Sequence, residues 1–147
     1  MTQARIQHVD LKTAGALADI HAKSFETGWS EDDFKIHIER DLVLGLWQDG
    51  RLAGFIILRI GGDQAEILTL AIAPIFRGQG LGAQLLKAGE ERVKIKGADV
   101  VFLEVAEDNL FAIRIYKGAA YQAIGRRPAY YRRKNGRVAS LNFSKNL

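Results

Sequence analysis

The sequence predicts an α/β (α+β) fold in a single domain over residues 1–147, with a central mixed, mostly antiparallel sheet of about seven strands flanked by about four helices. Three observations predict it. A chain of 147 residues is long enough for one domain with a single sizeable core. Apolar residues alternate between strand-like runs and helical spacing. In the middle of the chain, an apolar run, a glycine-rich loop, a helical pattern and a second apolar run follow one another, as in a right-handed crossover between parallel strands.

The N-terminal segments predict one strand and two helices. A strand over residues 5–9 precedes a helix over 11–25, in which apolar residues recur at helical spacing. Ser30 begins the second helix, because its hydroxyl can cap the first turn and three acidic residues follow it.

Three consecutive strands follow. The dipeptide Asp49-Gly50 lies between apolar runs at 42–47 and 52–60, which is a strong hairpin signal. Two glycines and an aspartate at 61–63 then turn the chain into a strand over 65–73.

The second half of the chain continues the crossover and adds two more strands. A helix runs from near Gln79 to Lys96, where Gly97 can end it, and a strand over 100–105 lies parallel to the one before the helix. The remaining elements are a helix over 109–118, a strand near 121–124, a basic loop over 126–137 and a last strand over 137–143.

The segment from Arg77 to Ala83 predicts an anion site. Three alternating glycines precede a helix whose first amides lack partners, so a phosphate can approach the backbone closely, with Arg77 as a fixed cation beside it. A nucleotide P-loop is excluded because no Lys followed by Ser or Thr comes after Gly82, and the spacing does not fit a dinucleotide fingerprint. The alternative is a turn that only lets the helix pack closely on the sheet.

Composition narrows the class of protein. An apolar fraction of 48% and a charged fraction of 26%, with no membrane-length apolar run, indicate an ordinary globular protein, and the first residues lack a signal-peptide core. The absence of cysteine excludes disulfides and a cysteine acyl-enzyme, and it favours the cytoplasm. Three histidines without metal-ligand spacing predict no metal site.

Basic residues cluster near the C-terminus, beside Tyr130 and Tyr131. This cluster can be a solvated loop, or it can bind an acidic acceptor, the phosphates of a cofactor, or RNA. Its members are Arg126, Arg127, Arg132, Arg133, Lys134 and Arg137.

Several short motifs follow one another along the chain, and their order and spacing together are specific. They are Trp29-Ser30, Ile67 to Pro74, Arg77 with Gly80 and Gly82, Leu103-Glu104-Val105 with Asn109, Tyr116, and Arg126-Arg127 with Tyr130-Tyr131. In these pieces the chain resembles the GNAT family of N-acetyltransferases, and most closely its RimI-like branch, which acetylates the N-terminus of bacterial ribosomal protein S18. One departure is Ala120-Tyr121, where the family usually has Gly-Phe after the tyrosine helix. If that position needs a positive φ, either alanine there costs about 1 kcal/mol or the turn shifts to Gly118.

The resemblance implies acetyl-CoA as cosubstrate, no metal, and a set of contacts. Backbone groups of the strand before the glycines would bind the pantetheine arm like an added strand, and an amide near Ile72 would polarise the thioester carbonyl. The implied cofactor contacts are Leu70, Ala71, Ile72, Arg77, Gly78, Gln79, Gly80, Leu81, Gly82, Ala83 and Asn109.

The resemblance also assigns two catalytic positions. Glu104 interrupts an apolar strand, where desolvation favours a stronger base, and the family has its proton acceptor at this position. Tyr116 takes the position of the proton donor to the departing thiolate. The alternatives are a salt-bridged surface acid for Glu104 and a core aromatic for Tyr116.

The predicted function is transfer of acetyl from acetyl-CoA to the N-terminal α-amine of a protein, with ribosomal protein S18 as the implied acceptor and with no membrane or direct nucleic-acid role. Acceptor-binding candidates are Trp29, Tyr130 and Tyr131. A lysine side chain or a small amine is the alternative acceptor in the same fold. A CoA-sensing or RNA-associated module without catalysis is the alternative from another class.

Overall fold

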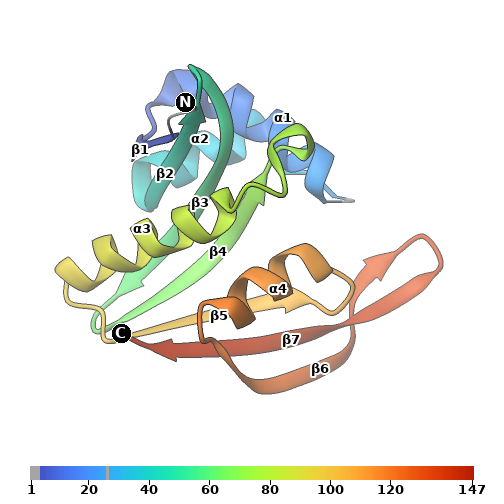
Figure 1. The fold of residues 1–147 in the computed structure, drawn as a ribbon. Coiled ribbons are helices and arrows are strands. Elements are labelled where there is room, and N and C mark those ends of the chain that lie inside the picture. The colour runs from blue at the N-terminus through green and yellow to red at the C-terminus, as the bar shows by residue number, and fades with distance from the viewer. Residues whose placement is uncertain (1–3, 26) are drawn as a thin grey trace.

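The structure is a computed structural model that describes residues 4–25 and 27–147. In these residues seven strands form one sheet and four α-helices cover it (Figure 1). The strands are β1 (Ala4–His8), β2 (Leu42–Gln48), β3 (Arg51–Gly61), β4 (Gln64–Ile72), β5 (Val100–Ala106), β6 (Gln122–Arg133) and β7 (Gly136–Asn146). The helices are α1 (Ala14–Ser24), α2 (Glu31–Arg40), α3 (Leu81–Ile95) and α4 (Leu110–Gly118), with short 3-10 turns at Leu11–Thr13 and Pro74–Phe76.

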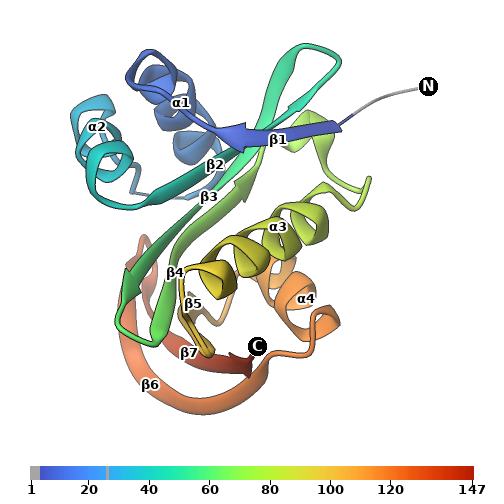
Figure 2. The same ribbon diagram turned by 90° about the vertical axis from the view of Figure 1, so that its left-hand side faces the viewer.

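The sheet has the order β1-β2-β3-β4-β5-β7-β6. Only β4 and β5 pair in parallel, and the other described neighbours are antiparallel. Helices α1 and α2 cover one face, and α3 and α4 cover the other (Figure 2). The predicted mixed, mostly antiparallel sheet and the crossover through α3 are therefore confirmed.

Two apolar cores lie on the two faces of the sheet. In β3, Phe55 and Ile57 pack with α1 and α2, whereas Ile56 and Leu58 pack with α3. Strands of this kind, buried on both faces, read as continuous apolar runs, which is why β3 shows no polar alternation.

β4 and β5 pair with each other along only part of their length. Their parallel pairing ends at Ile67 with Leu103, although both strands continue. At the same place Leu68 is an extra residue opposite β3, because Ile57 pairs with Thr69 and Leu58 with Ile67. A bulge of this kind bends its strand, and Figure 1 shows β4 and β5 diverging toward one end of the sheet.

Local chemistry explains the ends of the elements. Ser30 and Asp33 form a reciprocal capping box at the start of α2, since each side chain accepts a bond from the other residue's backbone amide. Asp49 and Gly50 both have positive φ, as a two-residue hairpin turn requires, and Gly97 has a φ of 102° where α3 ends. These signals were read correctly from the sequence.

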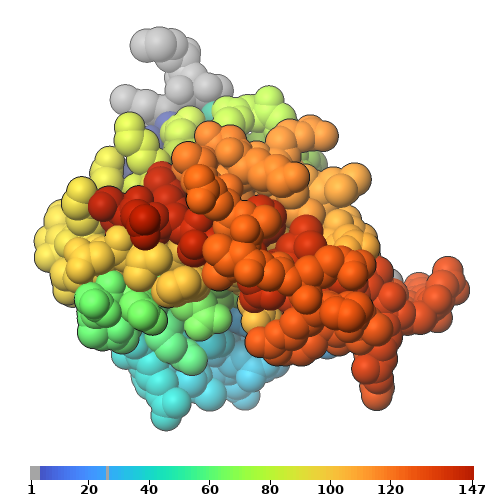
Figure 3. All heavy atoms as spheres, turned by 90° about the horizontal axis from the view of Figure 1, so that it is seen from below, coloured from blue at the N-terminus to red at the C-terminus, as the bar shows by residue number. Residues whose placement is uncertain are grey.

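The prediction of a basic loop over residues 126–137 is wrong. Most of this segment continues β6, which pairs with β7 up to Arg133 opposite Gly136. β6 is an edge strand whose residues are nearly all exposed, and its sequence therefore shows no apolar alternation. Its pairing is interrupted between Arg127 and Tyr131, where Ala129 has a φ of 54°. Atoms of β6 and β7 cover part of the face seen in Figure 3, and the end of the hairpin projects from it.

Ala120 is expected to destabilise the end of α4. It has a φ of 72°, and the amide of Tyr121 bonds the carbonyl of Tyr116 across it, as in a helix end that normally has glycine. Ala120→Gly should therefore raise the free energy of unfolding by about 1 kcal/mol, as measured by urea denaturation. The neighbouring Ala119 has a φ of −94°, so Ala119→Gly should lower it instead. Equal effects of the two substitutions would contradict the strain at Ala120.

Candidate active site

A cleft of about 840 Å³ lies where β4 and β5 diverge. Its walls come from five parts of the fold: the end of α1 with the segment that leads to α2, β4, the end of β5, the first turns of α4, and β6. Thr27, Asp108 and Arg132 on its lining are exposed, so the cleft opens to solvent. The cleft brings together Leu70, Glu104, Asn109, Tyr116, Trp29 and Tyr131 from the predicted site.

The edge of β4 beyond the bulge is open toward this cleft. The amide of Ala73 bonds the carbonyl of Ala53, so the alternation of a strand turns the backbone groups of Ile72 and Leu70 away from β3. The backbone groups of Ala71 are turned toward β3 by the same alternation. Leu70 therefore offers its amide and carbonyl, and Ile72 its amide, for pairing with an extended ligand.

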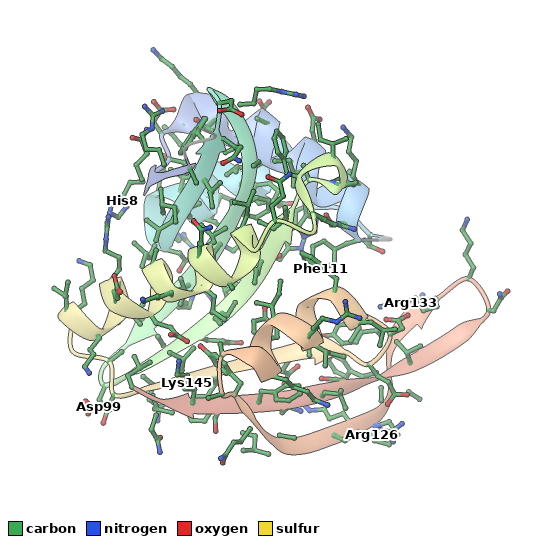
Figure 4. The ribbon with its side chains drawn as sticks, in the orientation of Figure 1. His8, Asp99, Phe111, Arg126, Arg133 and Lys145 are labelled. Atoms are coloured by element: carbon green, nitrogen blue, oxygen red, sulfur yellow. The ribbon has the colours of Figure 1, made fainter. Side chains whose placement is uncertain are left out.

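Arg77 joins three elements around the end of β4. Its Nε donates to the carbonyl of Ile72 at 2.9 Å, and its Nη2 donates to the hydroxyl of Ser24 at 3.1 Å. The guanidinium lies 4.8 Å from the ring centre of Phe111, which points from the first turn of α4 toward this region (Figure 4). The side chain thus connects β4 with α1 and α4, and a contribution of Arg77 to phosphate binding stays a prediction.

Different glycines of the glycine-rich segment have the geometry that each of the two alternatives from the sequence requires. Gly78 and Gly80 have φ values of 82° and 76°, and no atom lies within 4 Å of the position that a Cβ would take on either. At Gly82, by contrast, a Cβ would lie 2.5 Å from Cδ1 of Ile115. Gly82 therefore allows α3 and α4 to pack closely, while Gly78 and Gly80 leave the backbone accessible.

The first turn of α3 offers unpaired amides. Its first backbone bond runs from the amide of Gln84 to the carbonyl of Gly80, at 3.2 Å. The amides of Leu81, Gly82 and Ala83 have no backbone partner among the described residues. Gln79 is held from the other side, since the side-chain amide of Gln48 donates to its Oε1 at 3.3 Å. Such a preorganised helix start fits the phosphates of a cofactor.

Asn109 caps α4 from the wall of the cleft. Its Oδ1 accepts a bond from the amide of Ala112 at 3.1 Å. The cap uses the side-chain oxygen and leaves the NH₂ group as the donor available to a ligand.

Glu104 projects from the end of β5 on the α1–α2 side of the sheet. Its neighbours Leu103 and Val105 are buried in the core on the opposite side. The Glu104 side chain is 31% exposed, and its Oε1 pairs with Nη2 of Arg127 at 3.1 Å. The carboxylate is thus half-buried and paired rather than enclosed in an apolar strand.

Tyr116 reaches the same cleft from the other side of the sheet. It lies on α4 and is only 4% exposed, with the ring of Tyr121 at 5.7 Å. Burial raises the pKa of its phenol, so the group is protonated at neutral pH and can act as a donor.

Trp29 lies between two histidines at the wall of the cleft. The rings of His21 and His37 stack on it, each with its centre 4.8 Å away. Tyr131 lines the cleft, where burial, and to a lesser degree the charge of Glu104, raise its pKa. Tyr130 is 47% exposed, packs against Tyr131 and does not line the cleft.

His21 is expected to make the protein less stable in mild acid. It is 3% exposed, its Nδ1 accepts the amide of Trp29 at 3.2 Å, and burial lowers its pKa to about 4. The unfolded chain binds a proton near pH 6.5, but the folded protein does not until near pH 4, so stability is lost as the pH falls through this window. His21 should lower the free energy of unfolding by about 2 kcal/mol between pH 7 and pH 5.

Urea unfolding of His21→Gln, which keeps a hydrogen-bond acceptor but does not titrate, checks this effect. The variant should lose about 2 kcal/mol less than the wild type over the same pH interval. The same pH dependence in both proteins would contradict the assignment.

Sequence reasoning missed Thr69 and the partner of Glu104. Thr69 lines the cleft from β4. The sequence feature that could have indicated it is a single hydroxyl-bearing residue in the apolar run Ile67 to Ile72. Arg127 gave no such signal, because its pairing with Glu104 depends on how β5, β7 and β6 lie side by side.

An open strand edge beside a glycine-rich helix start, with a carboxylate and a buried phenol facing one cleft, defines an enzyme for group transfer from a phosphate-containing cosubstrate. No group of three or more metal-ligating side chains occurs among residues 4–25 and 27–147, and no helix in this part of the chain has the length and apolarity to cross a membrane.

Known proteins agree with this class. Residues 14–121 match the acetyltransferase (GNAT) family. A protein of Bacillus subtilis (strain 168), provisionally named a ribosomal protein bS18-alanine N-acetyltransferase, is 34% identical over 133 residues, which are 88% of each chain. The crystal structure of the ribosomal-protein-S18-alanine N-acetyltransferase from Escherichia coli superposes with a TM-score of 0.90 at 27% identity, over 98% of this chain and 94% of that one.

A more distant structure, yncA of Salmonella typhimurium with its cofactor acetyl-CoA, shares the fold. Its TM-score is 0.84 at 17% identity, over 98% of this chain and 94% of that one. The chain belongs to the acetyltransferase (GNAT) family and is an acetyl-CoA-dependent enzyme.

Proposed function

We propose that this enzyme transfers an acetyl group to the N-terminal α-amine of a protein, with ribosomal protein S18 as the leading acceptor. One observation carries the proposal: Glu104 and Tyr116 reach a single cleft from opposite faces of the sheet, at the point where β4 exposes its edge. The names of the Bacillus subtilis and Escherichia coli relatives support the choice of acceptor.

The residues of this chain fit acetyl-CoA, which supplies the acetyl group as an activated thioester. The amides of Leu81, Gly82 and Ala83 would bind the pyrophosphate, with Gly78, Gln79 and Gly80 giving room for it. Backbone groups of Leu70 and Ile72 would pair with the pantetheine arm, and the NH₂ of Asn109 would donate to it. The amide of Ile72 is turned away from β3 along the same strand edge, where it could donate to the thioester carbonyl.

Glu104 and Tyr116 would move the two protons of the reaction. Glu104 accepts a proton from the acceptor nitrogen, directly or through water, as that nitrogen attacks the acetyl carbonyl. Tyr116 donates its phenolic proton to the sulfur of the departing thiolate. With no cysteine in the sequence, acetyl transfer would go directly to the amine within a ternary complex.

The chemistry of the acceptor favours an α-amine over a lysine side chain. An α-amine has a pKa of about 8 and a lysine amine about 10.4, so far more of the former is neutral and nucleophilic at pH 7. A single half-buried carboxylate such as Glu104 can suffice for the α-amine.

The form of the cleft favours a peptide over a small amine. A small cationic amine would fit a closed, acidic pocket, whereas this cleft has an exposed rim and both charges on its lining. Trp29 and Tyr131 lie on its wall and can pack against the first residues of a peptide. A ribosomal acceptor would place the reaction in the cytoplasm.

Two peptides with an S18-like N-terminus test the proposal. One has a free α-amine, and the other is blocked there and carries a lysine. After incubation with acetyl-CoA, mass spectrometry should find acetyl on the free α-amine only. Acetyl on lysine would move the assignment to a lysine acetyltransferase. Absence of transfer to either peptide, despite calorimetric binding of acetyl-CoA, would reject this acceptor class.

A further inference from the structure

Thr69 has a buried hydroxyl group that lacks a hydrogen-bond partner in the part of the chain that the structure describes. The residue is 7% exposed, and its Oγ1 makes no hydrogen bond with any described residue. Buried polar groups in proteins are nearly always paired, because an unpaired one loses its hydration without compensation. Thr69 also lines the active-site cleft, so a bound molecule can supply the missing partner.

The bulge in β4 determines which way Thr69 faces. Ile67 packs in the core beside α3 and α4, whereas Leu68 packs against the core beside α1 and α2. Beyond the bulge Leu70 lies on the α3 side and Ala71 on the α1 side, so Thr69 lies on the α1–α2 side. Without the extra residue, strand alternation would put Thr69 on the same face as Ile67.

Glu104 faces the same side as Thr69. Leu103 and Val105 point into the α3–α4 core, so the side chain between them projects toward α1 and α2. Glu104 comes one residue, and Thr69 two residues, after the last pair that joins β5 to β4, and both line the cleft. Tyr116 comes from α4 on the opposite face. The predicted proton donor, Tyr116, thus lies on one face of the sheet, and the carboxylate of Glu104 and the hydroxyl of Thr69 lie on the other.

We infer that Thr69 is a positioning residue for the acceptor: its hydroxyl oxygen accepts a hydrogen bond from the acceptor's N-terminal nitrogen and holds that nitrogen beside Glu104. The inference rests on the proposed function, because it concerns the amine that this function acetylates. A hydroxyl suits the task, since it can accept from an amine N–H and still donate elsewhere. Its burial without a protein partner would then be a cost in stability kept for function.

The variants Thr69→Val and Thr69→Ser test the inference, because valine replaces only the hydroxyl with a methyl group and serine keeps the hydroxyl. Thr69→Val should lower kcat/KM for the free α-amine peptide by roughly tenfold to a hundredfold, with calorimetric affinity for acetyl-CoA unchanged. Its Tm should rise by about 2–4 °C, since an unpaired buried hydroxyl is removed. Thr69→Ser should stay close to the wild-type kcat/KM.

Opposite changes in stability and activity, with rescue by serine, would support a role in positioning. Wild-type kcat/KM in Thr69→Val would overturn the inference and leave the proposed function intact. Loss of acetyl-CoA affinity in Thr69→Val would also overturn it, by assigning Thr69 to the cofactor. If the wild-type enzyme leaves the free α-amine unlabelled, the proposed function and the inference both fail.

Discussion

Replacing Glu104 with glutamine is expected to lower kcat by roughly 100-fold to 10,000-fold, the usual contribution of a positioned general base. Glutamine keeps the size of the side chain but cannot accept a proton. The affinity for acetyl-CoA should change little, because Glu104 lies on the α1–α2 side of the cleft and the glycine-rich segment lies at the start of α3. Steady-state kinetics with the free α-amine peptide and calorimetry with acetyl-CoA measure the two effects separately.

Two control variants separate the base from its surroundings. Glu107→Gln removes a nearby carboxylate that pairs with Arg126 and does not line the cleft, so it should leave kcat close to that of the wild type. Arg127→Gln removes the ionic partner of Glu104 without removing the carboxylate. Full turnover in Glu104→Gln would exclude Glu104 as the base. An equal loss in Arg127→Gln would assign the effect to the ion pair.

The elements that the sequence predicted well are those defined by neighbouring residues. The capping box of Ser30, the turn at Asp49 and Gly50, and the helix end at Gly97 all depend on residues a few positions apart. Apolar runs identified the inner strands, because those strands are buried on both faces. Even the strain at Ala120 followed from one local rule, that helix ends of this type favour glycine.

The misjudged or missed features depend on pairing between distant segments. β6 is an exposed edge strand, so its basic second half shows no apolar alternation that would distinguish it from a loop. The orientation of Thr69 depends on a bulge that exists only in the pairing of β3 with β4. Arg77 binds Ser24, which precedes it by 53 positions. Local sequence patterns carry no information on contacts of this kind.

The glycine-rich segment offers the second large effect. Gly80→Asp should weaken acetyl-CoA binding by roughly a hundredfold, because it puts a negative charge beside the amides that are expected to bind the pyrophosphate. Aspartate tolerates positive φ better than most residues, and no atom lies within 4 Å of the Cβ position, so the variant should fold. Gly80→Asn has nearly the same shape without the charge and should lose much less affinity. Calorimetric titration with acetyl-CoA at low salt measures both.

A substitution at Gly62 tests whether the effect depends on placing the charge at the start of α3. It also has a positive φ, of 63°, with open space around its Cβ position, but it lies in the turn between β3 and β4 at the other end of the strand from the glycine-rich segment. Gly62→Asp should therefore share the backbone cost of Gly80→Asp and keep wild-type affinity for acetyl-CoA. Rising salt should narrow the difference in acetyl-CoA affinity between Gly80→Asp and Gly80→Asn, because salt screens the repulsion between the aspartate and the cofactor's phosphates. Wild-type affinity in a folded Gly80→Asp protein would rule out phosphate binding at this helix start and leave the glycines with only the packing role seen at Gly82.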